Sequence, residues 1–354
     1  MNRAGRWFLR SGIQEANGGV ARYYLADEQR NKPVSTEITG YAVSAFVYLH
    51  SVTQEQVYLE RAIAGARFLS RTAWRNELDT MPFETEPTAE GLLAYFFDAG
   101  IIVRGLLAAW RATGDDEFLV AARNTGRAMA RDYRDGDGQY HPILRLPERE
   151  PLARDDRWSR STGCYQLKSA MAWYDLAEAT GDPSLRAPYD TVLDYSLRTY
   201  AGFLPGHPDR RKVMDRLHAF SYFLEGLLPR ASEPRCGAAL CDGMRRVEHW
   251  LREIGPEFER SDVYAQLLRA RIHADWAGVV PLDKSAAEWE AGQLKEFQHA
   301  SPDPRIDGGF YFGRRGDRWL PFVNPVSTAF ALQALQLWEQ AKQGGGQAHR
   351  HLLI

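Results

Sequence analysis

The chain has 354 residues, of which 44% are hydrophobic and 25% charged, and its formal net charge is −2. This balance is typical of a globular protein and gives no reason to expect nucleic acid or an anionic membrane as a partner. The N-terminal segment lacks an apolar secretory core, and no apolar run reaches the ~18 residues of a membrane span. Three cysteines are too few for a disulfide framework, so the sequence predicts a cytoplasmic protein.

Two similar stretches stand near the ends of the chain, KPVSTEITGYAVSAF at 32–46 and NPVSTAFALQALQLW at 324–338. Each carries Pro-Val-Ser-Thr before an apolar helical pattern. Proline fixes the approach to a helix, and serine or threonine caps its first turn, so we expect two matching helix starts. Where the first stretch carries Glu37, the second carries Ala329.

Between these stretches the chain repeats a plan of helix, turn and helix. Thr-Gly-Asp occurs at 113–115 and again at 180–182. Glycine permits a left-handed helix stop there, and aspartate is a good N-cap for the next helix. The helices before the turns are apolar almost all round and are predicted to be buried, whereas those after them are amphipathic and should lie outside. Candidate inner helices start near residues 36, 98, 163, 218, 262 and 327.

Six inner and about six outer helices predict an all-α (α/α)6 toroid, a six-hairpin barrel, with an open α-solenoid as the alternative. In a closed ring the first and last inner helices are neighbours. We therefore expect residues 33–45 and 325–337 to form adjacent inner helices.

Strand-like patterns are short and confined to two Gly-flanked or aromatic pieces, at 21–26 and 308–315, which are predicted to form loops or small hairpins. The organisation we expect is a single toroid domain over residues 1–342. The Gly-, Gln- and His-rich end at 343–354 is predicted to be a flexible tail.

Three stretches, STEITGY (35–41), FDAGIIVRGLLAAWRATGD (97–115) and HAFSYFLEGLL (218–228), carry a family resemblance together with the hairpin rhythm. They resemble the six-hairpin glycosidase superfamily and, within it, bacterial proteins linked with exopolysaccharide biosynthesis. The resemblance spans nearly the whole chain and implies a carbohydrate-binding central groove. That superfamily includes hydrolases, polysaccharide lyases and sugar epimerases, so the resemblance does not choose the reaction.

Other classes of toroid enzyme and cofactor sites are disfavoured by the motifs. The sequence lacks the Asp-rich motif of terpene cyclases and the zinc-binding Cys and His residues of lanthionine cyclases. It also has no P-loop, dinucleotide fingerprint or metal-ligand cluster. We therefore predict neither a cofactor nor a metal.

Glu37 and Asp98 are the sharpest catalytic candidates, because each falls in the first turn of an apolar helix. Aligning the repeats places Ala329 and Tyr165 opposite them, so hairpin packing does not itself demand an acid. The alternative is a helix-dipole or capping role. Two carboxyls at the helix starts, opening into one groove, suit acid–base hydrolysis of a glycosidic bond. A separation of about 5 Å suggests retention of configuration and ~6.5–9.5 Å suggests inversion.

His218, Tyr222 and Glu225 share one face of a helix by their spacing. They could bind sugar hydroxyls or remove a proton next to a carbonyl, or else form a hydrogen-bonded core network. A second polar stripe has the same helical spacing and could instead face outward: Asp262, Gln266, Arg269 and His273.

Further candidates for sugar contacts are aromatic, polar and cationic side chains on helices and loops. The predicted substrate-binding residues are Tyr41, Arg104, Trp158, Glu225, Asp262, Tyr311 and Trp319, and two more cations for an acidic sugar are Arg22 and Arg314.

The first functional hypothesis is a glycoside hydrolase of bacterial polysaccharide metabolism. The second is a sugar or uronate epimerase, or a polysaccharide lyase, that uses His218 and Tyr222. The third is a non-catalytic glycan-binding protein whose partners belong to a polysaccharide-assembly system.

Overall fold

The computed structural model describes residues 2–136 and 139–354, which are mostly helical, as the predicted all-α class requires. The chain divides into two compact units that interleave along the sequence. Unit 1 comprises the residues up to 13 together with 23–32 and 199–350, and unit 2 comprises 14–22, 33–198 and 351–354. The prediction of one domain over 1–342 stays a prediction.

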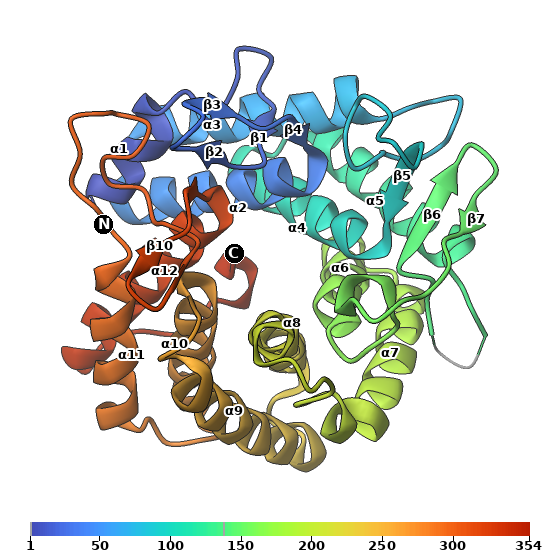
Figure 1. The fold of residues 1–354 in the computed structure, drawn as a ribbon. Coiled ribbons are helices and arrows are strands. Elements are labelled where there is room, and N and C mark those ends of the chain that lie inside the picture. The colour runs from blue at the N-terminus through green and yellow to red at the C-terminus, as the bar shows by residue number, and fades with distance from the viewer. Residues whose placement is uncertain (1, 137–138) are drawn as a thin grey trace. The chain divides into compact units, whose positions relative to one another are not determined.

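The elements of each unit are helical hairpins accompanied by very short strands (Figure 1). The helices of unit 2 are α2 (Thr36–Thr53), α3 (Gln56–Arg67), α4 (Phe96–Thr113), α5 (Asp116–Asp132), α6 (Gln166–Thr180) and α7 (Arg186–Thr199). Those of unit 1 are α1 (Asn2–Arg10), α8 (Arg210–Leu227), α9 (Pro234–Ile254), α10 (Ser261–Trp276), α11 (Lys284–Glu296) and α12 (Pro325–Lys342).

The strands form small antiparallel sheets at the ends of the helices. In unit 2, β1 (Val20–Ala21) pairs with β4 (Val34–Ser35), and β5 (Leu92–Tyr95), β6 (Ile143–Leu146) and β7 (Glu150–Pro151) form one sheet. In unit 1, β2 (Tyr24–Leu25) lies between β3 (Arg30–Asn31) and β11 (Phe322–Val323), and β9 (Gly313–Arg315) lies between β8 (Glu259–Arg260) and β10 (Arg318–Trp319). The pieces predicted at 21–26 and 308–315 thus contribute short strands.

The turns between paired helices match the sequence prediction. Gly114 and Gly181 end α4 and α6 in the left-handed region, with φ of 71° and 70°. Asp115 caps α5 by accepting the backbone N–H of Glu117 at 3.1 Å. The helices before the turns are buried on nearly all faces, and α5 buries only one face, so the predicted burial pattern is confirmed for these pairs.

The two Pro-Val-Ser-Thr stretches begin their helices differently. Ser35 is the N-cap of α2 and accepts a backbone N–H of the first turn at 3.4 Å, as predicted. In the second stretch, however, α12 begins at Pro325, and Asn324 caps it by accepting the backbone N–H of Val326 at 2.8 Å. The prediction that serine or threonine caps this second helix is wrong, because asparagine is a strong N-cap and proline suits the first helical position.

Two threonines reveal the structural register of these helix starts. Thr39 donates its hydroxyl to the Ser35 carbonyl at 2.7 Å and accepts the backbone N–H of Val20, the first residue of β1, at 2.9 Å. Thr328 does the same with the Asn324 carbonyl at 2.8 Å and with a loop N–H at 3.0 Å. Asn324 is therefore the counterpart of Ser35, and the tetrapeptides are offset from the structural match.

The corrected register changes the residue that corresponds to Glu37. Glu37 is the second helical residue after its cap, and the same position in α12 is Val326, so the predicted match with Ala329 is wrong. The conclusion drawn from the match still holds, since an apolar residue fills the equivalent position. Asp98 is the third residue of α4, after Tyr95 as N-cap.

The sheet of β5, β6 and β7 was not predicted. The register of β5 and β6 pairs Tyr95 with Ile143 and Leu92 with Leu146, and α4 begins directly after β5. These strands are too short to show an alternating pattern, and they pair across almost fifty residues of intervening chain. The sheet sets the direction in which the chain enters α4, and therefore the place of the first turn that carries Asp98.

Helices α2 and α4 lie side by side, and small residues let their backbones touch (Figure 1). A Cβ built on Gly105 would lie 2.5 Å from the Gly40 carbonyl oxygen. A Cβ on Gly100 would lie 2.5 Å from the Cα of Ser169, at the crossing of α4 with α6. Since real Cβ atoms do not approach so closely, these two glycines permit the helix spacing.

The last residues of the chain are packed into unit 2. Leu353 and Ile354 are 2% and 1% exposed, and their carbonyl oxygens accept hydrogen bonds from Arg104 at 3.0 Å and from Lys168 at 3.2 Å. The prediction of a flexible tail over 343–354 is therefore wrong at its end. The segment before these two residues is polar and rich in glycine, which favours disorder. The last two residues are nevertheless held in place, because their apolar side chains are buried and two buried cations donate hydrogen bonds to their carbonyl oxygens.

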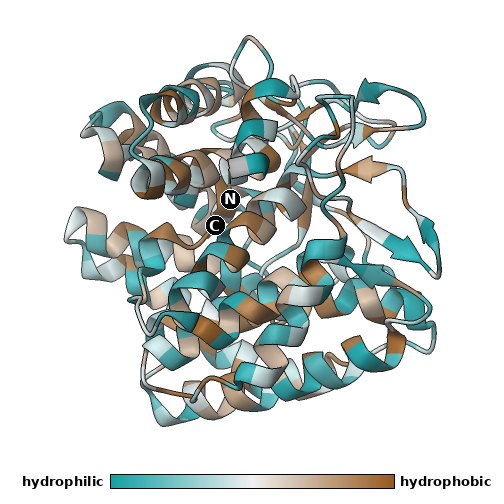
Figure 2. Cartoon of the chain, turned by 90° about the vertical axis from the view of Figure 1, so that its left-hand side faces the viewer, coloured by the Kyte–Doolittle hydropathy of each residue, from teal (hydrophilic) through white to brown (hydrophobic). Residues whose placement is uncertain are grey.

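Charged and polar residues interrupt the apolar ones along the helices seen in Figure 2. Within the described residues, no helix combines the length and the apolar character that crossing a membrane requires.

We predict that Gly105→Ala destabilises the protein by about 1–3 kcal/mol, because the added methyl group must push α2 and α4 apart. This loss should exceed the roughly 1 kcal/mol that alanine gains over glycine within a helix. The matched control is Gly292→Ala in α11, where a Cβ meets nothing within 4 Å, and it should raise stability slightly. Urea unfolding of the three proteins measures both effects, and equal midpoints for the two variants would contradict the close crossing.

Candidate functional site

Unit 2 contains a cavity of about 220 Å³ that brings together the two carboxylic acids singled out from the sequence. Its walls come from the starts of α2, α4 and α6 and from the loops that precede them. The lining residues are Arg22, Glu37, Phe83, Tyr95, Phe97, Asp98, Pro142, Trp158, Ser159 and Tyr165. The cavity therefore opens where buried helices begin, as predicted for the groove.

The first turns of α2 and α4 place the two acids on the cavity wall. Glu37 is half-buried, whereas Asp98 is only 5% exposed. Ser35 caps α2 from its own side chain, so Glu37 is not needed as the cap. One carboxyl oxygen of Asp98, Oδ2, is buried and has no hydrogen-bond partner among the described residues. An unbonded buried carboxyl oxygen is costly for stability, which favours a role for Asp98 in binding or chemistry.

Burial dominates the electrostatics of the pair. It raises the pKa of Glu37 to about 7, against the opposing pull of the nearby Arg22 guanidinium. Burial and then the negative charge of Glu37 raise the pKa of Asp98 well above its usual range, with Arg22 again opposing. Both shifts favour the protonated forms, and the charge of Glu37 makes Asp98 harder to ionise once Glu37 has lost its proton. A carboxyl pair in which one member holds its proton more strongly than the other is what acid–base catalysis needs.

Arg22 supplies the positive charge of this cavity. Its guanidinium pairs with Glu84 at 3.1 Å and lies 5.0 Å from the ring centre of Phe83. These contacts anchor the cation beside the two acids, where it favours their ionised forms. A cation in this position was among the predicted contacts for an acidic sugar.

Aromatic rings make up half of the cavity wall. Trp158 packs edge-on against Tyr165 with ring centres 5.0 Å apart, and Phe83 packs against Tyr95 at 5.1 Å. Such rings offer apolar faces to the C–H groups of a sugar. Burial, together with the charge of Asp98, raises the pKa of Tyr95 to about 12, so its hydroxyl keeps its proton and can donate a hydrogen bond.

Two predicted substrate-binding residues of unit 2 do not line this cavity. Tyr41 is buried in α2 at 2% exposure. Arg104 is buried in α4, where its Nε lies 3.1 Å from Asp175 Oδ2 and its guanidinium also holds the end of the chain. Arg104 therefore has a structural ion pair, and the prediction that it binds substrate has no support from its surroundings.

Sequence reasoning missed most of the loop residues of the wall. Phe83, Pro142 and Ser159 lie in segments without a periodic pattern, so nothing local marked them. Tyr95 and Phe97 flank Asp98 directly, and this aromatic neighbourhood is the one signal that could have identified them.

In unit 1, the polar residues of α8 and α10 form a buried network. The Nδ1 of His218 lies 2.8 Å from Gln266 Oε1 and 3.3 Å from Asp262 Oδ2. Asp262 in turn accepts two hydrogen bonds from Arg260, at 3.0 and 2.6 Å. The imidazole also packs edge-on against the ring of Tyr222, with centres 4.6 Å apart.

This network determines the protonation of His218. Burial lowers the pKa of His218 to about 4, although the charge of Asp262 opposes this, so the imidazole is neutral near pH 7. Both neighbours of Nδ1 are acceptors, so the proton sits on Nδ1 and Nε2 carries the lone pair. Burial alone would raise the pKa of Asp262, but Arg260 outweighs it and keeps the carboxylate ionised. A histidine oriented in this way is equipped to act as a base.

Other predicted residues of unit 1 have structural partners. Glu225 and Arg269 form an ion pair in which neither side chain is exposed, and Arg269 also donates to Gln333 at 3.0 Å. His273, the last member of the polar stripe on α10, is 4% exposed. The outward-facing alternative for that stripe is wrong, since Asp262, Gln266, Arg269 and His273 are all buried.

Tyr311 and Trp319 gather around a histidine at the surface of unit 1. The ring centre of His299 lies 4.6 Å from the ring centre of Tyr311 and 4.4 Å from that of Trp319. This aromatic cluster matches the residue types predicted for sugar stacking. It shares no residue with the His218 network.

Comparison with solved structures shows the fold. A cellobiose 2-epimerase from Spirochaeta thermophila matches with a TM-score of 0.74 at 14% identity, covering 97% of this chain and 95% of that one. A cellobiose 2-epimerase from Bacillus thermoamylovorans gives 0.72 at 12% identity, covering 94% and 95%. A family 76 glycoside hydrolase from a bovine Bacteroides thetaiotaomicron strain gives 0.57 at 13% identity, covering 94% and 77%.

These likenesses confirm the predicted fold class, an all-α (α/α)6 toroid. At such low identities they carry the fold alone. No protein-family model matches the chain, and no curated protein matches it.

The raised pKa of Glu37 predicts how stability changes with pH. A carboxyl with a higher pKa in the folded than in the unfolded state favours the folded state while it is protonated. This advantage is lost as pH rises from the ordinary value of 4.5 to about 7. We expect the wild type to lose roughly 1–2 kcal/mol over this range relative to Glu37→Gln, an amount reduced because Glu37 keeps some contact with solvent.

Urea unfolding at pH 5 and pH 7.5 measures this difference. Asp116→Asn, which removes an exposed first-turn carboxylate from α5, is the control and should keep the wild-type profile. Parallel profiles for the wild type and Glu37→Gln would show that Glu37 does not titrate in this range.

Proposed function

We propose that the protein is a carbohydrate-active enzyme that hydrolyses a glycosidic bond with Glu37 and Asp98 as its catalytic pair. One observation carries the proposal: two carboxyl groups with raised pKa values line one aromatic cavity, and a buried oxygen of Asp98 has no hydrogen-bond partner among the described residues. Hydrolysis of a glycosidic bond requires one protonated and one ionised carboxyl group.

The electrostatics assign the roles. Asp98 keeps its proton because ionised Glu37 disfavours a second negative charge, so Asp98 is the general acid. It gives its proton to the glycosidic oxygen as the bond from that oxygen to the anomeric carbon breaks. Glu37 takes a proton from a water molecule whose oxygen bonds to the anomeric carbon, or else attacks that carbon directly before water completes the reaction. Either route consumes one water molecule and needs no other reactant.

The cavity suits the substrate class in size and lining. A volume of about 220 Å³ is below the roughly 300–1,000 Å³ typical of drug-sized ligands, so it fits about one sugar unit. Trp158 and Tyr165 offer ring faces and edges, and Arg22 offers a cation for a sugar carboxylate or hydroxyl. The fold agrees with this proposal, since a family 76 glycoside hydrolase shares it.

A second candidate function is epimerisation or isomerisation of a free sugar, favoured by the His218 network. Nε2 of His218 would take a proton from a carbon next to a carbonyl group. Return of a proton to the opposite face of the same carbon inverts its configuration with no net reactant. Asp262 would stabilise the imidazolium formed on the way, and Tyr222 would hold the ring in place. Solved structures of this fold include cellobiose 2-epimerases and a D-mannose isomerase.

A role in exopolysaccharide biosynthesis and polysaccharide-assembly partners stay predictions of the sequence resemblance, and a cytoplasmic location stays a prediction from the N-terminal segment and the three cysteines. A buried Asp98 oxygen without a hydrogen-bond partner lowers the stability of the fold, and a protein that only binds glycans would gain nothing from it. The geometry therefore argues against the non-catalytic hypothesis. The experiments below separate all three hypotheses.

We predict that Glu37→Gln and Asp98→Asn each lower glycan hydrolysis by roughly 10²–10⁴-fold, because the amides cannot exchange protons with substrate or water. At pH 5, where Glu37 is mostly protonated in the folded protein, thermal unfolding should change little, since neither carboxyl serves as the helix cap. Reducing-sugar release from a panel of bacterial polysaccharides and oligosaccharides measures activity. Asp116→Asn is the control and should hydrolyse as the wild type does. Wild-type hydrolysis by both pocket variants would remove the hydrolase proposal.

The second candidate is tested by the incorporation of deuterium from solvent into the sugar. A base that removes a carbon-bound proton exchanges it with solvent, so an epimerase incubated with cellobiose or D-mannose in heavy water should label the carbon next to the carbonyl. We expect that label to disappear in His218→Asn if the second candidate is correct, with sugar affinity largely kept. NMR of the recovered sugar detects it. If the wild type leaves the sugar unlabelled and hydrolysis depends on Glu37, the epimerase candidate is excluded and the hydrolase proposal is kept.

A further inference from the structure

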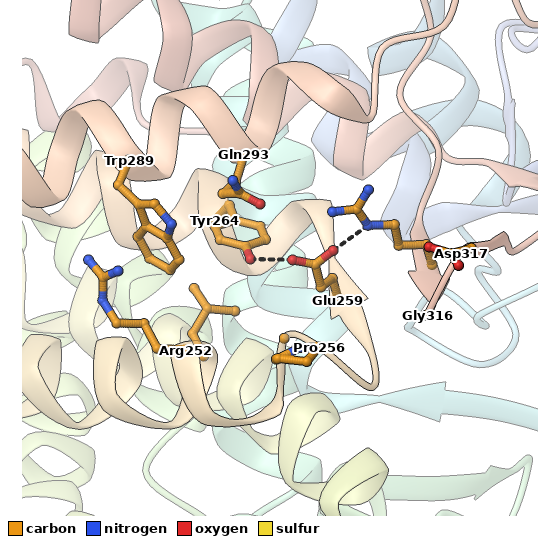
Figure 3. Close-up of a pocket in the computed structure, with 11 residues that line it drawn as sticks. Arg252, Pro256, Glu259, Tyr264, Trp289, Gln293, Gly316 and Asp317 are labelled. Atoms are coloured by element: carbon orange, nitrogen blue, oxygen red, sulfur yellow. Dashed lines mark hydrogen bonds and ion pairs between the residues drawn. The ribbon is translucent and has the colours of Figure 1, made fainter.

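Unit 1 contains a second cavity, of about 480 Å³, whose lining shares no residue with the Glu37–Asp98 cavity or with the His218 network. It lies where the end of α9, the start of α10 and the side of α11 meet the turn between β9 and β10. Figure 3 shows the residues on its walls, among them Arg252, Glu259, Tyr264, Trp289 and Gln293.

Both carboxyl oxygens of Glu259, the buried acid of this cavity, accept hydrogen bonds. Glu259 is 7% exposed, and its Oε1 accepts the hydroxyl of Tyr264 at 2.7 Å. Its other oxygen, Oε2, accepts the guanidinium of Arg314, as the dashed lines of Figure 3 show. With both oxygens bonded, Glu259 is poorly placed to exchange protons with a ligand. This contrasts with Asp98, whose Oδ2 lacks a partner among the described residues.

Both cations on the walls are paired as well, and the remaining charge on the walls is Asp317, an exposed acid in the turn between β9 and β10. Arg314 is matched by Glu259, and the Nε of Arg252 lies 3.0 Å from a carboxyl oxygen of Glu248 just behind the wall. An ionic ligand would have to compete with these partners. The lining therefore suits a ligand that is polar but carries no charge.

Two side chains of α11 supply hydrogen-bonding groups that the described protein leaves unused. Trp289 and Gln293 stand one helical turn apart, are half-buried, and both face the cavity in Figure 3. Within the described residues, neither the indole N–H nor the side-chain amide makes a hydrogen bond. The centre of the indole ring lies 3.6 Å from the guanidinium carbon of Arg252. It lies 5.5 Å from the ring centre of Tyr264, and these two rings pack edge-on.

We propose that this cavity is a second carbohydrate site that holds a neutral sugar unit without reacting with it. A rigid aromatic ring, an indole N–H, a free amide and two paired cations together match the mixed apolar and hydroxyl surface of a neutral sugar. The choice of a sugar as occupant rests on the proposed function of the chain. Such a site would retain a polymer on the protein between rounds of reaction, through binding at two places on one chain.

The test is an NMR titration of the tryptophan indole N–H signals of the full-length protein with cellobiose, maltose and mannobiose. The Trp289 signal is identified by its absence from Trp289→Phe, which keeps an aromatic ring. We expect at least one of the three disaccharides to shift this signal saturably. Gln293→Ala should weaken that binding about 5–10-fold, the worth of one to two hydrogen bonds.

Two control measurements keep the result interpretable. Circular dichroism should show Gln293→Ala folded, because this side chain makes no hydrogen bond within the described residues. In Glu37→Gln the Trp289 titration should be unchanged, so failure of hydrolysis and failure of this second site are separate outcomes. D-glucuronate should not shift the signal. A shift with glucuronate that fades with added salt would make the cavity an anion site, and no shift with any neutral disaccharide would overturn the proposal.

Discussion

The close crossing of α2 and α4 is the constraint on which the candidate site depends. Gly105 and Gly40 let the two helix backbones touch, and this contact keeps their first turns near one another. Glu37 and Asp98 stand in those turns, so helix spacing sets whether their carboxyls share one cavity. The same proximity raises the pKa of Asp98 through the charge of Glu37. A structural contact between small residues thus adds the charge of Glu37 to burial, which is the larger cause of the raised pKa of Asp98.

Three polar groups illustrate how differently this protein treats buried charge. Glu225 and Arg269 form an ion pair in which neither side chain is exposed, which is a structural solution. Asp262 is ionised by Arg260 and orients His218, so its charge serves a neighbour. Asp98 has neither an ion-pair partner of this kind nor a hydrogen bond to its Oδ2 among the described residues. A native structure tolerates such a cost where the group has a task, and this supports the Glu37–Asp98 cavity as the proposed catalytic centre.

The solved structures of this fold include sugar epimerases, a sugar isomerase and glycoside hydrolases, so the fold does not choose between the two reactions. The two candidates use different parts of the chain. Hydrolysis would rely on first-turn carboxyls of unit 2, and epimerisation on a neutral histidine of unit 1. Both need an environment that shifts a pKa by burial, upward for the carboxyls and downward for the imidazole, and both shifts follow from taking a charged form out of water.

The sequence by itself determined the local features: the helical hairpins, the glycine stops at 114 and 181, and the two acids in otherwise apolar helices. Each depends on residues a few positions apart, and so their patterns are readable along the chain. Only the tertiary structure decided that Arg22 and Trp158 join Glu37 and Asp98, and that Arg104 is held by Asp175. These outcomes depend on packing between segments distant in sequence, where small differences in backbone spacing choose which side chains meet.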